Sequence, residues 1–164
     1  GGMPFILGDF VNSNPVLIKD SFNGMYGNLN LGGANGYSTF LAAKAARTSV
    51  LFAGSNDGML HAFNASTGEE RWAYVPPMIM SNLWRLADKD YANNHRFFVD
   101  GPLTVTDIQD GSTWKTILVG SLGKGGRGYF ALDIIQHIDS NSFKYGCSNW
   151  DKRRYSTHHL PQHK

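Results

Sequence analysis

The sequence has little that would tie it to a disulfide framework or a membrane. Cys147 is the only cysteine among 164 residues, so no disulfide can form within the chain. No apolar run reaches the length of a membrane span, and residues 3–7 are too short for the core of a signal peptide. Gly1-Gly2 resembles residues added ahead of a protein segment. We therefore expect an internal piece of an exported protein rather than a cytosolic chain.

Charged residues are also scarce, at 17%, and the net charge is only +2, so we expect no nucleic-acid partner. The charged residues are unevenly distributed along the sequence. Residues 135–164 hold five Lys/Arg, two Asp and four of the six His, which leaves ten basic and eleven acidic side chains in residues 1–134. The sequence therefore predicts a folded part over residues 1–134 and a basic, poorly ordered tail over residues 135–164.

Motifs of catalysis are absent. The sequence contains no Gly-x-Ser-x-Gly, His-Glu-x-x-His or paired-carboxylate motif. Gly123–Gly128 satisfies G-x-G-x-x-G, but it precedes the strand-like Tyr129–Ile134 rather than a helix, which favours a hairpin turn over a phosphate loop. His158, His159 and His163 have a spacing that suits a metal, but adventitious binding by an unstructured tail is the favoured interpretation. We predict no catalytic, cofactor or metal residue and no enzymatic activity.

Glycine, by contrast, is abundant, with 19 residues, as in an all-β chain with many turns. The region from residue 49 to residue 77 contains three short apolar runs, Val50–Ala53, Met59–Phe63 and Trp72–Val75. The segments between these runs carry turn residues, Asn56, Asp57 and Gly58 in the first and Thr67 and Gly68 in the second. Asp-Gly and Thr-Gly provide the positive φ angles of tight turns. The pattern predicts a three-stranded antiparallel meander.

The same pattern then begins again, as an internal repeat. Further strands are predicted over three segments, Val99–Ile108, Trp114–Gly120 and Tyr129–Ile134, with a glycine turn that includes Gly125, Gly126 and Gly128. Gly54-Ser55 recurs as Gly120-Ser121, and Ala62-Phe63-Asn64 as Ala131-Leu132-Asp133. No Thr-Gly…Trp follows Asp133, so the second copy lacks its last strand. Repeated short antiparallel strands predict an all-β partial β-propeller of about one and a half to two blades.

Two helical insertions and several side-chain positions complete the expectation. Helices are predicted over Tyr37–Arg47, with Ser38 or Thr39 as N-cap, and within Met78–His95. Pro15 marks the start of an extended segment. Asp57 is expected to be a turn residue rather than a ligand of a quinone enzyme, and His61 a packed histidine. Four aromatic rings are expected to face inward: Phe52, Phe63, Trp72 and Tyr129. The rings of Trp72, Trp84 and Trp114 are expected to pack between blades rather than to form a stacking floor for a cofactor.

Ordered motifs then point to a family. They are Gly8–Val16, Asn56–Phe63, Trp72–Pro76, Asn82–Trp84, Tyr91–His95, Phe98–Gly101, Leu118–Gly123, Gly125–Tyr129 and Ala131–Asp133. In this order they resemble the C-terminal β-propeller, with quinoprotein-like blade repeats, of type IV pilus tip-associated adhesins (the PilY/PilC-like family). The acidic calcium loop of that family has no counterpart here, since Asp88-Lys89-Asp90 offers two carboxylates and no glycine. We expect no calcium or other cofactor in this chain.

The resemblance implies a surface-exposed fragment of a larger protein of pilus biogenesis and adhesion. Its expected location is the pilus tip at the bacterial cell surface, and its expected partners are minor pilins and a host-cell surface ligand. Two alternatives remain: a fragment of a quinoprotein dehydrogenase, which would need a calcium ion, a catalytic Asp and a complete ring, and an envelope scaffold propeller. Because an open blade leaves apolar faces and strand edges uncovered, we also expect self-association.

Overall fold

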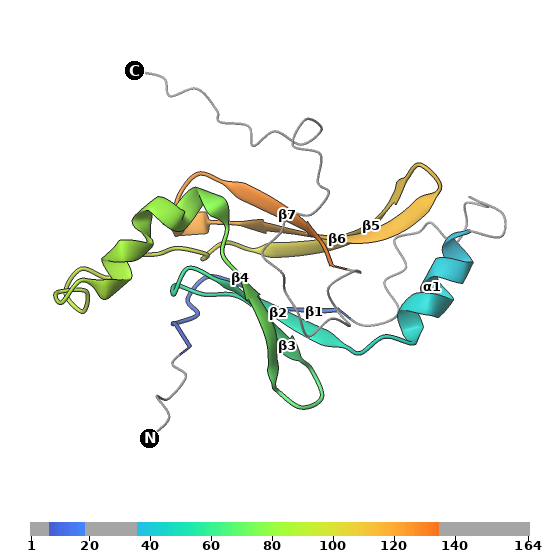
Figure 1. Ribbon diagram of the computed structural model, residues 1–164, viewed down its shortest axis with the longest axis horizontal. Coiled ribbons are helices and arrows are strands. Elements are labelled where there is room, and N and C mark those ends of the chain that lie inside the picture. Colours follow the sequence, from blue (N-terminus) through green and yellow to red (C-terminus); the bar gives the residue numbers. More distant parts are fainter. Residues whose placement is uncertain (1–6, 19–35, 135–164) are drawn as a thin grey trace, which may run out of the picture.

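The computed structural model describes residues 7–18 and 36–134. These residues form two antiparallel sheets that lie one over the other (Figure 1). The first sheet has the strand order β1 (Val16–Ile18), β2 (Val50–Gly54), β3 (Leu60–Asn64), β4 (Glu70–Tyr74). The second has the order β5 (Leu103–Asp110), β6 (Thr113–Ser121), β7 (Tyr129–Asp133). The predicted all-β architecture is confirmed.

The first sheet contains the predicted meander and one further strand. The three apolar runs form β2, β3 and β4, and Ala62 on β3 lies between Phe52 on β2 and Trp72 on β4. Gly58 and Gly68 in the two turns have φ angles of +92° and +74°, which few other residues adopt. The further strand, β1, begins directly after Pro15 and pairs antiparallel with β2. A strand of three residues is too short to show an alternating pattern, so the sequence indicated only an extended segment.

The second sheet starts later than expected, because the segment before it connects the two sheets. The backbone N–H of Val99 donates to the Ser55 carbonyl at 3.3 Å, and that of Asp100 to the Leu122 carbonyl at 3.2 Å. The strand begins four residues after Val99, at Leu103. Between β6 and β7 the glycine turn forms a short 3-10 helix, η4 (Gly123–Gly125). The segment is therefore a turn between antiparallel strands, as predicted.

The core lies between the sheets. Side chains alternate between the two faces of a strand, so residues two apart share a face. The buried members of the core are Ile18, Val50, Phe52, Leu60, Ala62, Trp72, Ile79, Phe98, Val99, Leu103, Leu118, Leu122, Phe130 and Ile134. Phe52 and Trp72 are buried as predicted, with ring centroids 5.5 Å apart.

The prediction is wrong for two of the four aromatic rings that were expected to face inward, Phe63 and Tyr129. Tyr129 is 74% exposed, because its neighbour Phe130 turns inward over Gly120, where a Cβ would collide with the Phe130 ring. Phe63 lies on the opposite face of β3 from Leu60 and Ala62, where its ring stacks on His61 at 5.8 Å. In both strands the alternation fixes the face, and aromatic character alone does not.

Helix α1 (Tyr37–Ala45) packs on the second sheet near the Thr113 end of β6. Its Tyr37 ring lies 4.6 Å from the Trp114 ring, and Phe40 lies 6.1 Å from the same ring. The predicted N-caps Ser38 and Thr39 are wrong, because Gly36 occupies that position and no side chain caps the helix. The Tyr37 ring contacts the sheet from inside the helix, so the helix starts two residues earlier than a Ser38 cap would allow and three earlier than a Thr39 cap would allow.

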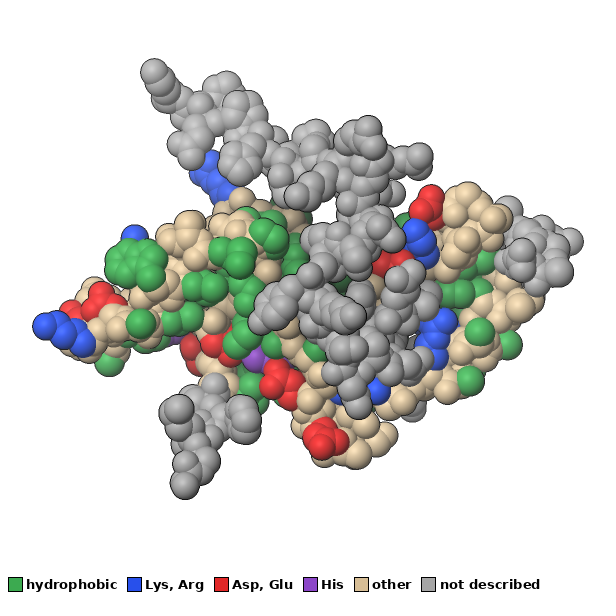
Figure 2. Space-filling model, in the orientation of Figure 1, with side chains coloured by type: hydrophobic (Ala, Val, Ile, Leu, Met, Phe, Trp, Pro, Cys, Tyr) green, Lys and Arg blue, Asp and Glu red, His purple; other side chains and the backbone are tan. Residues whose placement is uncertain are grey.

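The second insertion is the 3-10 helix η3 (Pro77–Ala87), between β4 and β5. Ile79 is buried, and Leu83 and Leu86 pack on the core. Trp84 was expected between blades, but it is 62% exposed, with the Arg85 guanidinium 4.8 Å from its ring centroid. Figure 2 shows hydrophobic side chains on the surface over this end of the molecule. No helix in residues 7–18 and 36–134 is long and apolar enough to cross a bilayer.

We expect Gly125→Ala to destabilise the chain strongly, by about 3 kcal/mol or more, because the new methyl group would collide with the backbone carbonyl of Phe98. Gly111→Ala is the control, since its Cβ would meet nothing within 4 Å and only its φ of +62° is unfavourable, at a cost of about 1–2 kcal/mol. Urea unfolding of both variants measures the difference. Equal losses would contradict the close contact between the glycine turn and Phe98.

Candidate functional site: a polar network around His61

His61 on β3 lies at the centre of a polar network on the outer face of the first sheet. Its side chain is only 2% exposed, and each ring nitrogen contacts a carboxylate. Nε2 lies 2.9 Å from Asp57 Oδ2, and Nδ1 lies 2.6 Å from Glu70 Oε1. The imidazole therefore links the turn before β3 to the first residue of β4, and it presents no unoccupied nitrogen.

Asp57 has further partners besides His61. Its Oδ2 accepts a hydrogen bond from the backbone N–H of Gly8 at 3.0 Å, and its Oδ1 accepts one from the N–H of Met59 at 3.0 Å. The first bond joins residues 49 positions apart in the sequence. The carboxylate therefore shapes the β2–β3 turn and also holds the N-terminal segment against it.

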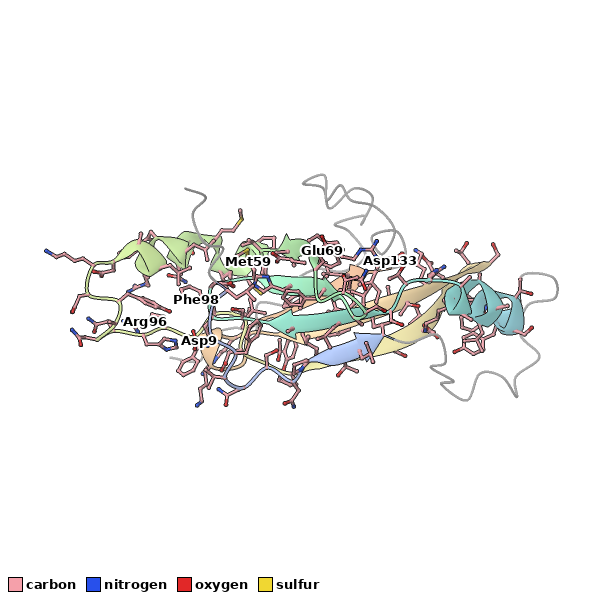
Figure 3. All side chains as sticks on the ribbon, turned by 90° about the horizontal axis from the view of Figure 1, so that it is seen from below. Asp9, Met59, Glu69, Arg96, Phe98 and Asp133 are labelled. Carbon is pink, nitrogen blue, oxygen red and sulfur yellow. The ribbon has the colours of Figure 1, made fainter. Side chains whose placement is uncertain are left out.

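Asn56, the residue before, connects three segments from a buried position. Its side-chain amide donates to Asp9 Oδ2 at 3.0 Å, and its Oδ1 accepts from the backbone N–H of Phe98 at 3.1 Å. The His95 Nε2 lies 3.1 Å from the same Asp9 carboxylate oxygen. Figure 3 shows Asp9 and Phe98 at the same end of the molecule. The turn residue Asn56 thus joins the N-terminal segment to the connection between the sheets.

Asp100 extends the network to the start of the second sheet. It is 1% exposed and accepts two hydrogen bonds from Asn12, one from the backbone N–H at 3.0 Å and one from Nδ2 at 2.6 Å. Ser13, the residue after Asn12, accepts a hydrogen bond at its Oγ from the backbone N–H of Gly54 at 2.9 Å. A buried carboxylate is tolerated when it accepts such bonds.

The network shifts the acid–base behaviour of three side chains. Burial alone lowers the pKa of His61, but the hydrogen bonds and charges of Asp57 and Glu70 outweigh it and raise that pKa above its ordinary value. Burial alone raises the pKa of Asp57, but His61 and the N–H groups of Gly8 and Met59 hold it below its ordinary value. For Asp9, hydrogen bonds from Asn56 and His95 similarly overcome burial and lower the pKa.

This arrangement is suited to joining segments rather than to reacting with a substrate. Both His61 nitrogens and both Asp57 oxygens already have partners inside the protein. Within the described ranges, no three His, Cys, Asp or Glu side chains lie close enough together to hold a metal ion. In Asp88-Lys89-Asp90, which offers two carboxylates and no glycine, the Asp90 carboxylate accepts hydrogen bonds from Asn93 and Asn94, each at 2.7 Å. Absence of calcium binding stays a prediction.

The other residues singled out from the sequence lie apart from this network. Thr67 and Gly68 form the turn at the opposite end of β3, where Thr67 Oγ1 accepts from the Glu69 N–H at 3.3 Å. Trp72 belongs to the core between the sheets. The three glycines belong to the turn of the second sheet, where Gly126 has a φ of +144°, Gly125 packs on Phe98, and a Cβ on Gly128 would collide with Met78.

Sequence reasoning missed a second buried cluster, around Asp107 on β5. Lys44 Nζ lies 2.8 Å from Asp107 Oδ1, Tyr37 OH donates to Oδ2 at 2.8 Å, and Thr116 Oγ1 donates to Oδ1 at 2.7 Å. Lys44 is 3% exposed and Asp107 is fully buried. The alternation of side chains along β5 could have indicated that Asp107 is buried. Asp107 lies two residues after Val105 and four after Leu103, so it shares a face of the strand with these inward-facing residues.

Comparison with known proteins identifies the family. The family model described as the PilY1 beta-propeller domain matches residues 7–145. The chain belongs to the PilY1 β-propeller family. The match continues eleven residues past the boundary at residue 134 that the sequence predicted, and residues 135–164 and their predicted character lie outside the described residues.

The PilY1 relatives are much longer than this chain. A type IV pilus biogenesis factor PilY1 homolog of Xylella fastidiosa is 45% identical over 130 residues, which cover 79% of this chain and 10% of the relative. The type IV pilus biogenesis factor PilY1 of Pseudomonas aeruginosa is 37% identical over 135 residues, 82% of this chain and 12% of the relative. The crystal structure of the P. aeruginosa PilY1 C-terminal domain is 38% identical with a TM-score of 0.46, covering 60% of this chain and 18% of that one.

The pKa shifts predict a pH window for stability. The raised pKa of His61 means that its contribution is complete below its unfolded-state value of about 6.5 and is lost as the pH rises through the folded-state value. The lowered pKa of Asp57 means that its contribution is complete above about 3.9 and is lost as the pH falls through the folded-state value. The network should therefore contribute most between about pH 4 and pH 6.5.

We expect His61→Phe to lower the free energy of unfolding by about 1–3 kcal/mol at pH 5.5, because it leaves Asp57 and Glu70 without their shared partner, and by less at pH 8.5. The control is His95→Phe, since His95 and its partner Asp9 are substantially exposed, and its cost should stay below about 1 kcal/mol. Denaturant unfolding at the two pH values measures both. A loss for His61→Phe that is the same at both pH values would contradict the raised pKa of His61.

Proposed function

We propose that this chain is a non-enzymatic structural segment of a type IV pilus biogenesis factor, acting in pilus assembly and surface adhesion at the pilus tip. The observation that carries the proposal is the family match over residues 7–145, together with relatives that are named pilus biogenesis factors. The proposed partners are minor pilins and a host-cell surface ligand. The proposed location is the bacterial cell surface.

The polar groups favour a structural role over the quinoprotein alternative. The carboxylates of Asp57 and Asp100 accept backbone hydrogen bonds that join the N-terminal segment to the rest of the fold. Asp107 is buried under α1 with three polar partners. Acidic side chains used in this way stabilise the fold, and their removal should reduce stability before it affects any reaction.

A chimera tests the proposal, with residues 7–134 replacing the matching stretch of P. aeruginosa PilY1. We expect it to restore surface pili and attachment to cells in a strain that lacks PilY1, and we expect minor pilins to co-purify with it. The same chimera with Gly125→Ala is the control for a misfolded segment. Pili without attachment would refute the adhesion role, and loss of pili despite normal protein levels would refute the assembly role. Redox activity with an added quinone cofactor would favour the enzyme alternative.

The exposed faces of the sheets predict self-association of the isolated chain at micromolar concentration. Tyr129 on the second sheet is 74% exposed and Leu17 on the first is 49% exposed, and burying such side chains is favourable. Sedimentation should show species larger than the monomer. Tyr129→Lys should weaken association by about tenfold or more, since a buried aromatic ring dominates such contacts. Trp84→Lys, at an exposed ring on η3, is the control and should change little. A single monomeric species would contradict the prediction.

A further inference from the structure

The sequence contains three aspartate–glycine pairs, and all three lie in turns or connections of the fold. They are Asp57-Gly58 in the β2–β3 turn, Asp100-Gly101 ahead of β5, and Asp110-Gly111 at the turn between β5 and β6. An aspartate before glycine is chemically vulnerable, because glycine has no side chain to keep the aspartate carboxyl group away from its backbone nitrogen. The three pairs share this local chemistry, so the fold decides which of them can react.

The reaction is isomerisation through a five-membered succinimide ring. The glycine backbone nitrogen attacks the side-chain carboxyl carbon of the aspartate, a C–N bond forms, and the amide proton and the carboxyl hydroxyl leave as water. Water then opens the ring at one of its two carbonyl carbons. Opening at the former side-chain carbonyl restores aspartate, and opening at the main-chain carbonyl gives isoaspartate. One water leaves and one enters, so the reaction needs no further reactant. It does need a carboxyl group that can turn and a glycine N–H without an acceptor.

Both groups are held in the Asp57-Gly58 pair. The side chain of Asp57 is 17% exposed, and its carboxylate contacts His61 and accepts two backbone hydrogen bonds. The backbone N–H of Gly58 donates to the Ser55 carbonyl at 3.3 Å. Attack on the carboxyl carbon would require both ends of the pair to leave their partners.

The Asp100-Gly101 pair is held still more tightly. Asp100 is 1% exposed, and Asn12 donates two hydrogen bonds to its carboxylate. The backbone N–H of Gly101 donates to the Ser121 carbonyl at 3.1 Å. A Cβ on Gly101 would collide with the Ser121 side chain, so the backbone has no room to rearrange here.

The Asp110-Gly111 pair differs in each of these respects. The side chain of Asp110 is 47% exposed, and its contact with Lys115 Nζ at 2.7 Å is a surface ion pair, which water readily replaces. In the part of the chain that the structure describes, the Gly111 N–H has no hydrogen-bond acceptor. A Cβ on Gly111 would meet nothing within 4 Å, so the turn is not crowded.

We propose that Asp110 is a site of spontaneous isomerisation to isoaspartate in the folded chain, and that the fold protects Asp57 and Asp100 from the same reaction. The product has one extra carbon in the main chain at the end of the β5–β6 hairpin. Asp110 pairs there with Thr113, and the next residue, Trp114, contacts α1. The modification would therefore loosen the end of the second sheet on which the helix packs.

Peptide mapping of the full chain after prolonged incubation at pH 6 tests the proposal. An isoaspartyl peptide keeps its mass, elutes separately and resists a protease that cleaves before aspartate. In concentrated urea all three pairs should isomerise at comparable rates. In the folded chain Asp110 should keep its rate in urea, whereas Asp57 and Asp100 should slow by about tenfold or more, since reaction there must first break hydrogen bonds to a carboxylate.

Asp110→Glu is the matched control. It keeps the carboxylate at the surface, but the longer side chain would have to close a six-membered ring, so the isomerised product at this position should disappear. Two results would overturn the proposal. One is a folded chain in which Asp110 slows by as much as Asp57 and Asp100. The other is a folded chain in which all three pairs react as fast as in urea, which would show that the hydrogen bonds of Asp57 and Asp100 give no protection.

Discussion

Contact between the inner faces of the two sheets is the constraint on which the described structure depends. A sheet of three or four short strands is only marginally stable alone and needs a second layer against its apolar face. Here Phe52, Ala62 and Trp72 of the first sheet share one core with Leu118 and Phe130 of the second. The alternation of side chains along each strand commits every other residue to this contact. Tyr129 and Phe63 therefore lie outside it although both are aromatic.

Polar contacts fix how the connecting segments meet the sheets. Three side chains accept hydrogen bonds from backbone N–H groups that lie more than 40 residues away in the sequence: Asn56, Asp57 and Asp100. These bonds hold the N-terminal segment and the Phe98 region in place. A carboxylate or amide that is fully hydrogen-bonded costs little to bury, whereas the loss of one partner leaves a desolvated group behind. This is why turn residues predicted only to reverse the chain also connect distant segments.

The sequence predicted the strands well because their turns have specific residue requirements. The two ends of β3 are marked by Asp57-Gly58 and Thr67-Gly68, and the glycine turn separates β6 from β7. The predicted strand positions are therefore close to the observed ones. The N-cap of α1 failed because contact between Tyr37 and Trp114 overrides the local preference of Ser38 and Thr39. The alternation along β5 indicates that Asp107 faces inward, but it does not indicate the partner of that side chain. The pairing of Asp107 with Lys44 and the contacts of Asp9 and Asp100 could not be predicted, because they join residues that come close only after the sheets have packed.

The buried Lys44–Asp107 pair also explains how the second sheet uses strands longer than those of the first. β5 and β6 have eight and nine residues, against five in β2 and β3, so part of their inner face extends past the first sheet. Helix α1 covers that part, with Tyr37 and Phe40 on Trp114. Apolar contacts alone would allow the helix to slide along the strands. The Asp107 carboxylate bonds to Lys44 and also to Tyr37 and Thr116. Because Lys44 must reach this one buried carboxylate, the helix has a single position along the strands. Since an unpaired buried charge is strongly unfavourable, the ion pair defines where the helix docks even if it adds little net stability.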